Sequence, residues 1–526
     1  MTNKIENSVS TNLKNDTNTF IYDYIIVGGG SAGCVLARRL SDCENITVLL
    51  IEAGADDNGL DRIQRPLRWL ENIGSPQDYL YRYQPNPILN NREIYAPRGK
   101  VLGGSGSINA MVWARGNQND YDSWAEAGNT GWDYESILPL FRKIEDWDNG
   151  ENSIHGKDGP IRVERPEKLH VIDAAAVKAG ISYGMPYMED SNIPAPEGVG
   201  LMSMNIGHGR RSSPFEGYLK PIIDKPNLNI LTDAKVLKLN IDNGVCTGLI
   251  YRKDDKEVTV AAKTEVVLSA GTFETPRILM LSGVGDAVEL KNLGIDLKVN
   301  LPGVGKNLQD HPLISLTFQL NQPLADLTYN LGGINYYWKS SPDLIKPDLM
   351  LIPIQYPILT QELAAKYEVP DNAFSVFVTL IDIKSKGYMK LTSSLPDAPL
   401  EIEPNLLKDP ADFQAMVKAV ELCMDLTQEP DLNKIIKSWV APDRRLKEGH
   451  LAEFIRNGCS TYFHPVGTCA MGKGPDAVVN NRLKVIGVQK LSIADASVMP
   501  QITTSNTNAP TIMIAEFAAE VLLGTR

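Results

Sequence analysis

A glycine-rich segment near the start of the sequence constrains the fold of this chain more than any other feature. A short β-branched run, 24–27, is expected to form a buried strand, followed by a helix over 32–40 and a second buried strand over 45–51. The glycines between the first strand and the helix are spaced as G-x-G-x-x-G, at Gly28, Gly30 and Gly33. The first allows a tight turn, the second lets a pyrophosphate approach the backbone, and the third lets helix and strand pack closely. The segment therefore predicts a dinucleotide site on a parallel α/β sheet.

Glu52 follows the second strand and indicates which dinucleotide the unit holds. It lies at about the 20-residue spacing at which an acidic side chain reaches the ribose of a bound dinucleotide. A carboxylate there accepts hydrogen bonds from ribose hydroxyls and repels a 2′-phosphate, so NADP is disfavoured. The alternative is a glycine-rich turn in an ordinary α/β domain that binds no ligand.

The length and charge of the chain limit its architecture and its partners. A chain of 526 residues is too long for one simple core, so two closely packed domains are expected. The net charge of −12, with both signs interspersed, argues against nucleic acid and anionic membranes as partners. No uninterrupted apolar stretch approaches the roughly 20 residues of a membrane span.

The N-terminus and the cysteines indicate the compartment. Residues 1–19 are polar and have no apolar core, so we expect a disordered tail without a signal peptide, and a cytoplasmic protein. The six cysteines are scattered without a C-x-x-C pair, which suits a reducing compartment and argues against a disulfide framework. The histidines show no ligand spacing, so no metal is expected.

Two later segments again combine glycine with other site-forming features. The glycine-rich loop 96–116 can press its backbone against a flat or phosphorylated ligand; the alternative is a surface loop without one. In the segment 265–285, a strand ends at Gly271, and a helix is expected from about Pro276 to near Gly283. This strand is expected beside the first strand, with its carboxyl end facing the same crevice.

The rest of the chain is less specific. The segment 227–240 alternates apolar and polar residues like one half-buried strand, and His311 lies in a predicted turn where a structural role is favoured. The region 313–459 mixes strand-like and helical runs without a cofactor motif, which fits a domain that covers the substrate. The C-terminal segment is expected to end as an amphipathic helix containing Glu516 and Glu520.

From about Tyr22 to its end, the sequence resembles the glucose-methanol-choline (GMC) oxidoreductase family. Two segments, 99–116 and 271–285, look like the two signatures of that family. His464 in "FHPVGT" and Asn508 in "NTNAPT" match its active-site pair, in an arrangement similar to the choline dehydrogenase-like and the aryl-alcohol or hydroxymethylfurfural oxidase-like branches.

The resemblance implies a mixed α/β fold. A Rossmann-like FAD-binding domain would accompany a discontinuous substrate-binding domain built on an antiparallel sheet. The implied FAD-binding segments are 20–158, 210–312 and 461–526. The implied substrate-binding segments are 159–209 and 313–460.

The resemblance also implies the site residues. The cofactor would be FAD, and it would be held non-covalently, because Ile108 occupies the position where some members carry a histidine bonded to the flavin. Tyr462 and Phe463 would line the substrate pocket. The implied FAD-binding residues are Gly28, Gly30, Ser31, Ala32, Gly33, Glu52, Ala53, Arg98, Leu102, Gly103, Gly104, Asn109, Met111, Val112, Val236, Ala270, Gly271, Asp495, Ala496, Pro510 and Thr511.

The implied activity is oxidation of a primary alcohol to an aldehyde, with hydride transfer to flavin N5. His464 would act as the base, because the ordinary pKa of histidine suits proton removal near neutral pH, and Asn508 would orient the hydroxyl. The partners would be a small alcohol and oxygen or another electron acceptor, and the protein would be a monomer or a homodimer.

Three other functions of the same fold remain open at this point. A flavin-dependent lyase uses the fold without net oxidation, and a fatty-acid photodecarboxylase uses it under blue light. The segment that resembles the photodecarboxylase substrate region, 346–357, contains no arginine. The third is a flavin-binding protein without catalysis, against which His464 and Asn508 argue. The sequence leaves open both the alcohol and the choice between oxidase and dehydrogenase.

Overall fold

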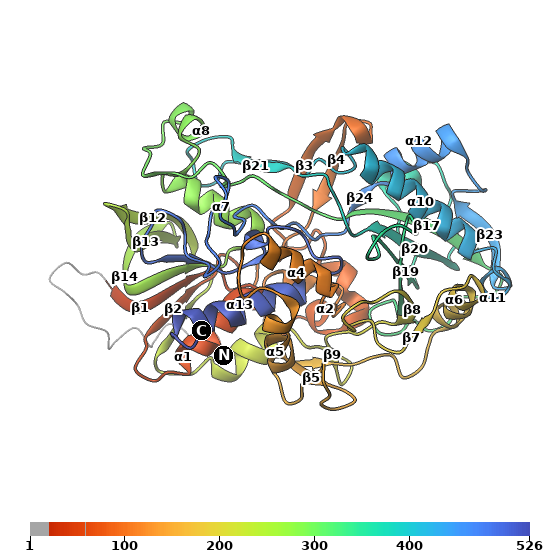
Figure 1. Ribbon diagram of the computed structural model, residues 1–526, viewed down its shortest axis with the longest axis horizontal. Helices are drawn as coiled ribbons and strands as arrows, with labels where there is room; N and C mark the ends of the chain where they lie inside the picture. The colour runs from red at the N-terminus through yellow and green to blue at the C-terminus, as the bar shows by residue number, and fades with distance from the viewer. Residues whose placement is uncertain (1–19, 58) are drawn as a thin grey trace.

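The computed structural model describes residues 20–57 and 59–526. The molecule is elongated, with one large β-sheet toward each end and helices around both sheets (Figure 1). The predicted N-terminal tail, 1–19, lies outside the described residues.

The first sheet has seven strands and contains the predicted strand–helix–strand unit. Strands β11, β2, β1, β14 and β25 run parallel to one another, whereas β13 pairs antiparallel with both β14 and β12. Helix α1 (Ser31–Ser41) connects β1 to β2, as predicted. Across the sheet the strands are β11 (Leu228–Leu231), β2 (Val48–Ile51), β1 (Phe20–Val27), β14 (Lys256–Leu268), β13 (Val245–Lys253) and β12 (Lys235–Asp242), with β25 (Leu491–Ile493) beside β14.

The carboxyl ends of the parallel strands meet at one edge of this sheet. Val27 at the end of β1 is paired with Ile51 of β2 and Leu268 of β14. The prediction that the strand before Gly271 lies beside the first strand is therefore confirmed. Backbone groups just beyond these strand ends share one crevice, which is where α/β sheets bind ligands.

Several element boundaries differ from the sequence predictions: β1 begins at Phe20 rather than at residue 24, and β2 begins at Val48 rather than at residue 45. The predicted strand 227–240 is two strands, β11 and β12, because Asp233 between them takes a positive φ of 53° and turns the chain. Helix α7 (Gly271–Leu281) begins before the predicted Pro276. The reason is Gly271, whose φ of 82° lets the chain turn from β14 directly into the helix.

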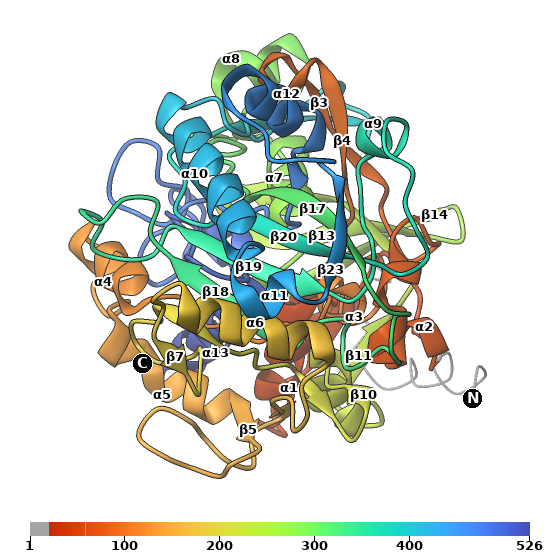
Figure 2. The same ribbon diagram turned by 90° about the vertical axis from the view of Figure 1, so that its right-hand side faces the viewer.

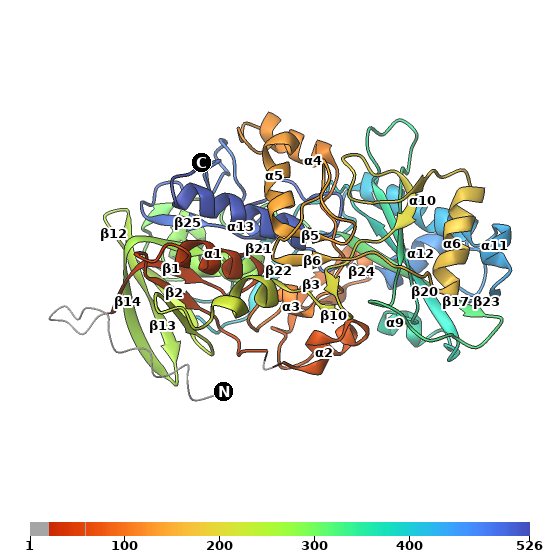
Figure 3. The same cartoon turned by 90° about the horizontal axis from the view of Figure 1, so that it is seen from below.

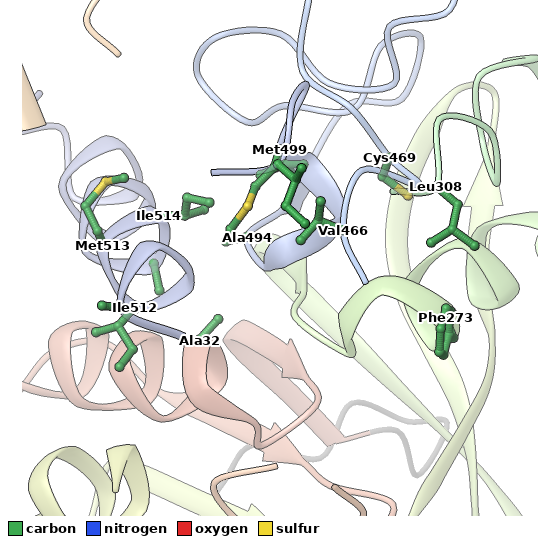
Figure 4. Packing of buried hydrophobic residues seen from close by; sticks show 14 of the residues in the cluster. Ala32, Phe273, Leu308, Val466, Cys469, Ala494, Met499, Ile512, Met513 and Ile514 are labelled. Atoms are coloured by element: carbon green, nitrogen blue, oxygen red, sulfur yellow. The ribbon is translucent and has the colours of Figure 1, made fainter. Parts of the chain in front are cut away.

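Helices α1 and α13 (Asn508–Leu522) lie side by side along the sheet (Figure 3). Figure 4 shows Ala32 of α1 and Ile512 of α13 within this contact. The prediction that α13 is amphipathic is wrong, because 11 of its 15 residues are buried and none is fully exposed; Glu516 has an exposed fraction of 0%. Its carboxylate is bound by Arg39 at 2.7 Å and Lys143 at 2.9 Å, so this acidic residue faces partners inside the protein.

The second sheet has eight strands and is mainly antiparallel. Two separate parts of the chain supply it, 187–201 and 312–461, as expected for a discontinuous unit. Helices α6 (Val171–Ser182), α10 (Pro410–Leu426) and α11 (Pro430–Asn433) cover one face (Figure 2). Its strands are β23 (Ile436–Ala441), β17 (Pro312–Leu320), β20 (Ala373–Leu380), β19 (Leu349–Ile354), β18 (Ile334–Trp338), β8 (Gly198–Leu201) and β7 (Tyr187–Met188), with β24 (Ser460–Thr461) beside β17.

The predicted mixed α/β fold is confirmed, whereas the exact domain boundaries stay a prediction. Within the described part of the chain, no helix is both long enough and apolar enough to cross a membrane. Other helices are α2 (Asp61–Gln64), η1 (Pro66–Asn72), α3 (Ser105–Ile108), α4 (Gln118–Glu126), α5 (Tyr134–Ile144), α8 (Ala287–Asn292), α9 (Gln361–Ala364) and α12 (Glu448–Gly458). Short strand pairs are β3 (Tyr81–Asn86) with β4 (Arg92–Ala96), β5 (Glu145–Trp147) with β6 (Ile161–Val163), β9 (Ile206–Gly207) with β10 (Arg210–Arg211), β15 (Val284–Gly285) with β16 (Val299–Asn300), and β21 (Tyr388–Leu391) with β22 (Leu400–Glu403).

A buried charge network joins β5 to the loop that follows it. The Arg115 guanidinium donates two hydrogen bonds to the Glu145 carboxylate, one of them at 2.9 Å. His155 bridges Glu145 at 2.8 Å and Asp190 at 2.7 Å, and its ring stacks on Trp147. Although burial alone lowers the pKa of His155, its hydrogen bonds with Asp190 and Glu145 raise that pKa above its usual value.

This raised pKa predicts a pH-dependent contribution to stability. Protonated His155 adds stability that is fully present below the unfolded pKa of about 6.5 and is lost as pH rises through the folded pKa. We expect His155→Gln to lower the free energy of unfolding more at pH 6 than at pH 9, measured by urea unfolding of both proteins across this range. A difference between the two proteins that does not change with pH would contradict the prediction.

Candidate active site

One cavity extends from the crevice of the first sheet to strands β19 and β20 of the second sheet. It brings together most of the predicted site residues from distant parts of the chain. Gly33, Leu102, Gly103 and Pro510 are outside its lining. The predicted residues that line it are Gly28, Gly30, Ser31, Ala32, Glu52, Ala53, Arg98, Gly104, Asn109, Met111, Val112, Val236, Ala270, Gly271, Tyr462, Phe463, His464, Asp495, Ala496, Asn508 and Thr511.

The glycine loop between β1 and α1 fits a ligand that approaches its backbone. A Cβ on Gly28 would meet the Ser269 carbonyl oxygen at 2.6 Å, and one on Gly33 would meet the Gly28 carbonyl oxygen at 1.9 Å, so protein packing explains both. Gly30 is different: its φ is −73°, and a Cβ there would meet nothing closer than 3.9 Å. Because Gly30 lines the cavity at the N-terminus of α1, which has no side-chain cap, the loop suits a phosphate group.

Glu52 lies beside this loop at the end of β2. Its carboxylate accepts hydrogen bonds from the backbone N–H groups of Gly29 at 2.7 Å and Gly54 at 2.8 Å. Burial raises the pKa of Glu52 to about 7, although these hydrogen bonds oppose the shift. The structure thus places Glu52 at the cavity, and its contact with a ribose stays a prediction.

The Asp495 carboxylate, which follows β25, binds the first turns of α7. One carboxylate oxygen accepts from the Gly271 N–H at 2.9 Å and from the Thr275 hydroxyl at 2.7 Å. These contacts hold the start of α7 against the cavity, where Ala270 and Gly271 form part of the lining. The residues of the first sheet therefore form a cradle of backbone groups, consistent with the size and polarity of a dinucleotide.

His464 lies buried farther along the cavity and has a hydrogen-bond partner at each ring nitrogen. Its Nδ1 is 3.0 Å from Nδ1 of His311, and its Nε2 is 3.0 Å from Nδ2 of Asn506. Burial, reinforced by His311 and the positive charge of Arg98, holds the pKa of His464 well below its usual value. Burial also lowers the pKa of His311 to about 3, so both rings are neutral at neutral pH.

These contacts determine which nitrogen of His464 is basic. The Asn506 amide Nδ2 can only donate a hydrogen bond, so Nε2 of His464 is unprotonated and accepts that bond through its lone pair. The proton of the neutral ring is then on Nδ1, from which it is donated to His311. This arrangement presents an unprotonated Nε2 at the cavity, as a general base requires.

The structure separates two asparagines of the "NTNAPT" segment. Asn506 contacts His464, whereas Asn508, the first residue of α13, accepts a hydrogen bond from the Ser31 hydroxyl at 2.8 Å. The Nδ2 of Asn508 is buried without a partner in the described structure. The sequence analysis did not identify Asn506, although it lies within the same motif as Asn508.

His311 is a second contact of His464 that the sequence did not predict. Its motif suggested only an ordered turn, yet its ring packs edge-on to His464. Nothing in the local sequence relates these two histidines, because β24 and β17 bring their segments together. His311 itself does not line the cavity, so it acts on the site through His464.

Tyr462 and Phe463 line the cavity next to His464, and their contact with a substrate stays a prediction. The Tyr462 ring is 4.5 Å from the His464 ring between centroids. Phe463 has a φ of 67°, which is rare for a bulky side chain, and its carbonyl oxygen accepts a hydrogen bond from Arg98. Strained backbone of this kind is typical of active sites.

The cysteines and the possible metal ligands of the described residues limit the chemistry of the site. All six cysteines are free thiols, and no group of three or more His, Cys, Asp or Glu residues within 20–57 and 59–526 is arranged to hold a metal ion. The cavity combines a backbone cradle, the neutral imidazole of His464 and four amide side chains, those of Asn109, Asn330, Asn506 and Asn508. Such a set can bind a dinucleotide and remove a proton from a bound hydroxyl.

Two family models match the chain, both described as GMC oxidoreductase, at residues 22–313 and 384–515. The chain is 37% identical to an alcohol dehydrogenase [acceptor] of Pseudomonas putida, with 96% of each protein covered. It is 36% identical to an oxygen-dependent choline dehydrogenase of Sinorhizobium fredii, with 95% of each covered. A crystal structure of pyridoxine 4-oxidase from Mesorbium loti matches with a TM-score of 0.91 at 30% identity, covering 95% of this chain and 98% of that one.

Proposed function

This chain belongs to the GMC oxidoreductase family, and we propose that it oxidises a primary alcohol to an aldehyde, with His464 as the base. GMC oxidoreductases are FAD-dependent enzymes, and the chain is an enzyme that acts on CH–OH groups. One observation carries the proposal. His464, whose Nε2 accepts from Asn506, lines the same cavity as the glycine cradle, which supports proton removal beside a bound dinucleotide.

The side chains around His464 fit the transfer of a proton from an alcohol. Bound FAD would supply the hydride acceptor at flavin N5. The Nε2 lone pair of His464 would exchange its hydrogen bond with Asn506 for one with the substrate hydroxyl, and would then take the proton. The unpartnered Nδ2 of Asn508 would donate to the developing alkoxide, while Ser31 fixes the orientation of this amide.

The residues of the cradle fit FAD held without a covalent bond. Ile108 ends α3 and lines the cavity with an aliphatic side chain that cannot bond to a flavin. We therefore expect acid precipitation of the yellow protein to release its flavin completely into the supernatant, as measured by absorbance. Flavin that remained with the precipitated polypeptide would contradict non-covalent binding.

The activity is tested by mixing the purified FAD-loaded enzyme with alcohols in the absence of oxygen. Bleaching of the oxidised flavin spectrum, with formation of the aldehyde, is the expected result. Release of an aldehyde and hydrogen cyanide from a cyanohydrin without flavin reduction, or release of carbon dioxide from a fatty acid only under blue light, would favour the lyase or the photodecarboxylase. The relatives bear the names of alcohol and choline dehydrogenases, so these alternatives are not favoured. Reoxidation of the reduced enzyme by oxygen or by an artificial acceptor would then identify the electron acceptor.

A further inference from the structure

The end of the cavity beyond His464 has walls unlike those of the dinucleotide cradle. These walls belong to a hydrophobic cluster that is separate from the main core. Their residues come from η1, from β19 and β20, and from the segment before His464. The cluster members that line the cavity include Trp69, Ile73, Met202, Ile352, Phe377 and Tyr462.

The polar atoms of these walls are mostly bonded to the protein itself. Trp69 donates its indole N–H to the Asn330 carbonyl oxygen at 2.9 Å. The side-chain amide of Asn330 donates to the Ala110 carbonyl oxygen and accepts from the Gly332 N–H at 3.3 Å. The polar groups left for a substrate are therefore gathered beside His464, and a substrate body beyond them would contact apolar side chains.

The charges of the cavity are placed away from these apolar walls. Among the described residues, the carboxylates that line the cavity are Glu52, Glu274 and Asp495, all in the part formed by the first sheet and α7. Each is already engaged, Glu52 and Asp495 by backbone N–H groups and Glu274 by Arg277 at 3.1 Å. Beside Phe463, the positive guanidinium of Arg98 donates to its carbonyl oxygen, whereas the buried Asp310 carboxylate, which accepts from the His464 N–H at 2.8 Å, lies outside the cavity lining.

A cationic substrate would meet no opposite charge on these walls. It would lose its hydration and approach the positive Arg98, which is unfavourable for a buried ion. Ring faces can attract a cation, but the Tyr462 ring already packs against the Phe377 ring, edge to face at 83°, and against His464 at 4.5 Å between centroids, so its contacts lie within the protein. A neutral apolar group instead gains from burial against the same side chains.

We infer that the substrate is a neutral primary alcohol with an apolar body, aliphatic or aromatic, and not a quaternary ammonium alcohol. This inference rests on the proposed function, because it concerns the alcohol whose hydroxyl would meet His464. Each methylene group that enters the apolar end should raise the efficiency of flavin reduction about fourfold, until the space is filled.

The test compares two alcohols that have the same shape and differ in charge. The FAD-loaded enzyme is mixed anaerobically with choline or with 3,3-dimethylbutan-1-ol, in which carbon replaces the charged nitrogen, and flavin reduction is followed by stopped flow. A series from butan-1-ol to octan-1-ol measures the effect of each methylene. The neutral alcohol should be more efficient than choline by at least about tenfold.

The outcomes separate this inference from the function on which it rests. If choline equals or exceeds its neutral counterpart, the inference is wrong, although alcohol oxidation stands. If none of the alcohols reduces the flavin, both the proposed function and this inference are overturned.

A charge placed on the wall provides a second test. Ile73 is half-buried and lines the apolar end, so Ile73→Glu would add the missing carboxylate at a position that can stay hydrated. It should lower the preference for 3,3-dimethylbutan-1-ol over choline by about tenfold. The control, Ile345→Glu, changes a side chain with an exposed fraction of 88% outside the cavity and should leave the preference unchanged. An unchanged preference in a correctly folded, FAD-loaded Ile73→Glu variant would contradict the assignment of this wall.

Discussion

Replacing His464 with alanine is expected to slow flavin reduction by an alcohol by about 10²–10⁴-fold, the usual contribution of a general base. FAD should stay bound, because His464 lies beyond the glycine cradle and Glu52. The measurement is anaerobic stopped flow at saturating alcohol, since steady-state turnover can hide this step behind reoxidation or product release. The variant must show wild-type FAD content and thermal stability. A rate within a few-fold of wild type would mean that another group takes the proton.

The pH dependence of the same step follows from the surroundings of His464. The sequence alone predicts a rise in rate near the ordinary histidine pKa, as the imidazole loses its proton. The structure shifts this rise to lower pH, because burial, His311 and Arg98 lower the pKa of His464. The wild-type rate should therefore be flat above neutral pH and fall only in acid, and the fall should be absent from His464→Ala. A rise centred above pH 7 that depends on His464 would contradict this environment.

The largest loss of stability is expected from Arg115→Met. This change leaves Glu145, whose side chain has an exposed fraction of 0%, without its guanidinium partner. Breaking a buried ion pair in this way typically costs about 3–5 kcal/mol, and here the Glu145 charge keeps only His155 at 2.8 Å and the Trp113 indole N–H at 2.7 Å as partners. Equilibrium urea unfolding, followed by tryptophan fluorescence, measures the difference in free energy.

Two comparisons test the cause of that loss. Adding Glu145→Gln to Arg115→Met removes the stranded charge and should restore part of the stability, because the neutral amide is less costly to bury. Lys418→Met breaks the exposed pair with Glu421 and should have little effect. If Arg115→Met were no more damaging than Lys418→Met, the buried network would not contribute to stability in the way its geometry indicates.

The parts of the fold that the sequence predicted well are those that depend on neighbouring residues. The glycine loop, α1 and the strands on either side form one continuous segment. The residues that determine their structure are therefore neighbours in the sequence. The strand before Gly271 could also be placed, because its pattern repeats that of the first unit. The antiparallel sheet and the GMC fold followed from the resemblance of long motifs rather than from periodicity.

The parts that could not be predicted depend on contacts between distant segments. The sequence predicted that Glu516 lies on the polar side of an amphipathic helix. Nothing in its own segment indicates that Arg39 and Lys143 form ion pairs with it. His311 and Asn506 were missed as partners of His464 for the same reason. The hydrogen-bonding partners of a buried base depend on which strands and loops pack together. Neither residue spacing nor composition predicts that packing.

The late position of β25 and α13 in the chain determines when the cofactor site can form during synthesis. The ribosome makes β1, α1 and β2 first, and then the whole antiparallel sheet, before it reaches the strand and the helix that pack against β14 and α1. His464 is made shortly before β25, and Asn506 and Asn508 follow β25. N-terminal domains usually fold first during synthesis. Here the sheet that contains β1 is complete only after β25 has been made. We therefore expect flavin loading to follow translation of residues 491–522, and a chain interrupted before them to lack part of the cavity lining, including Asp495 and Asn508.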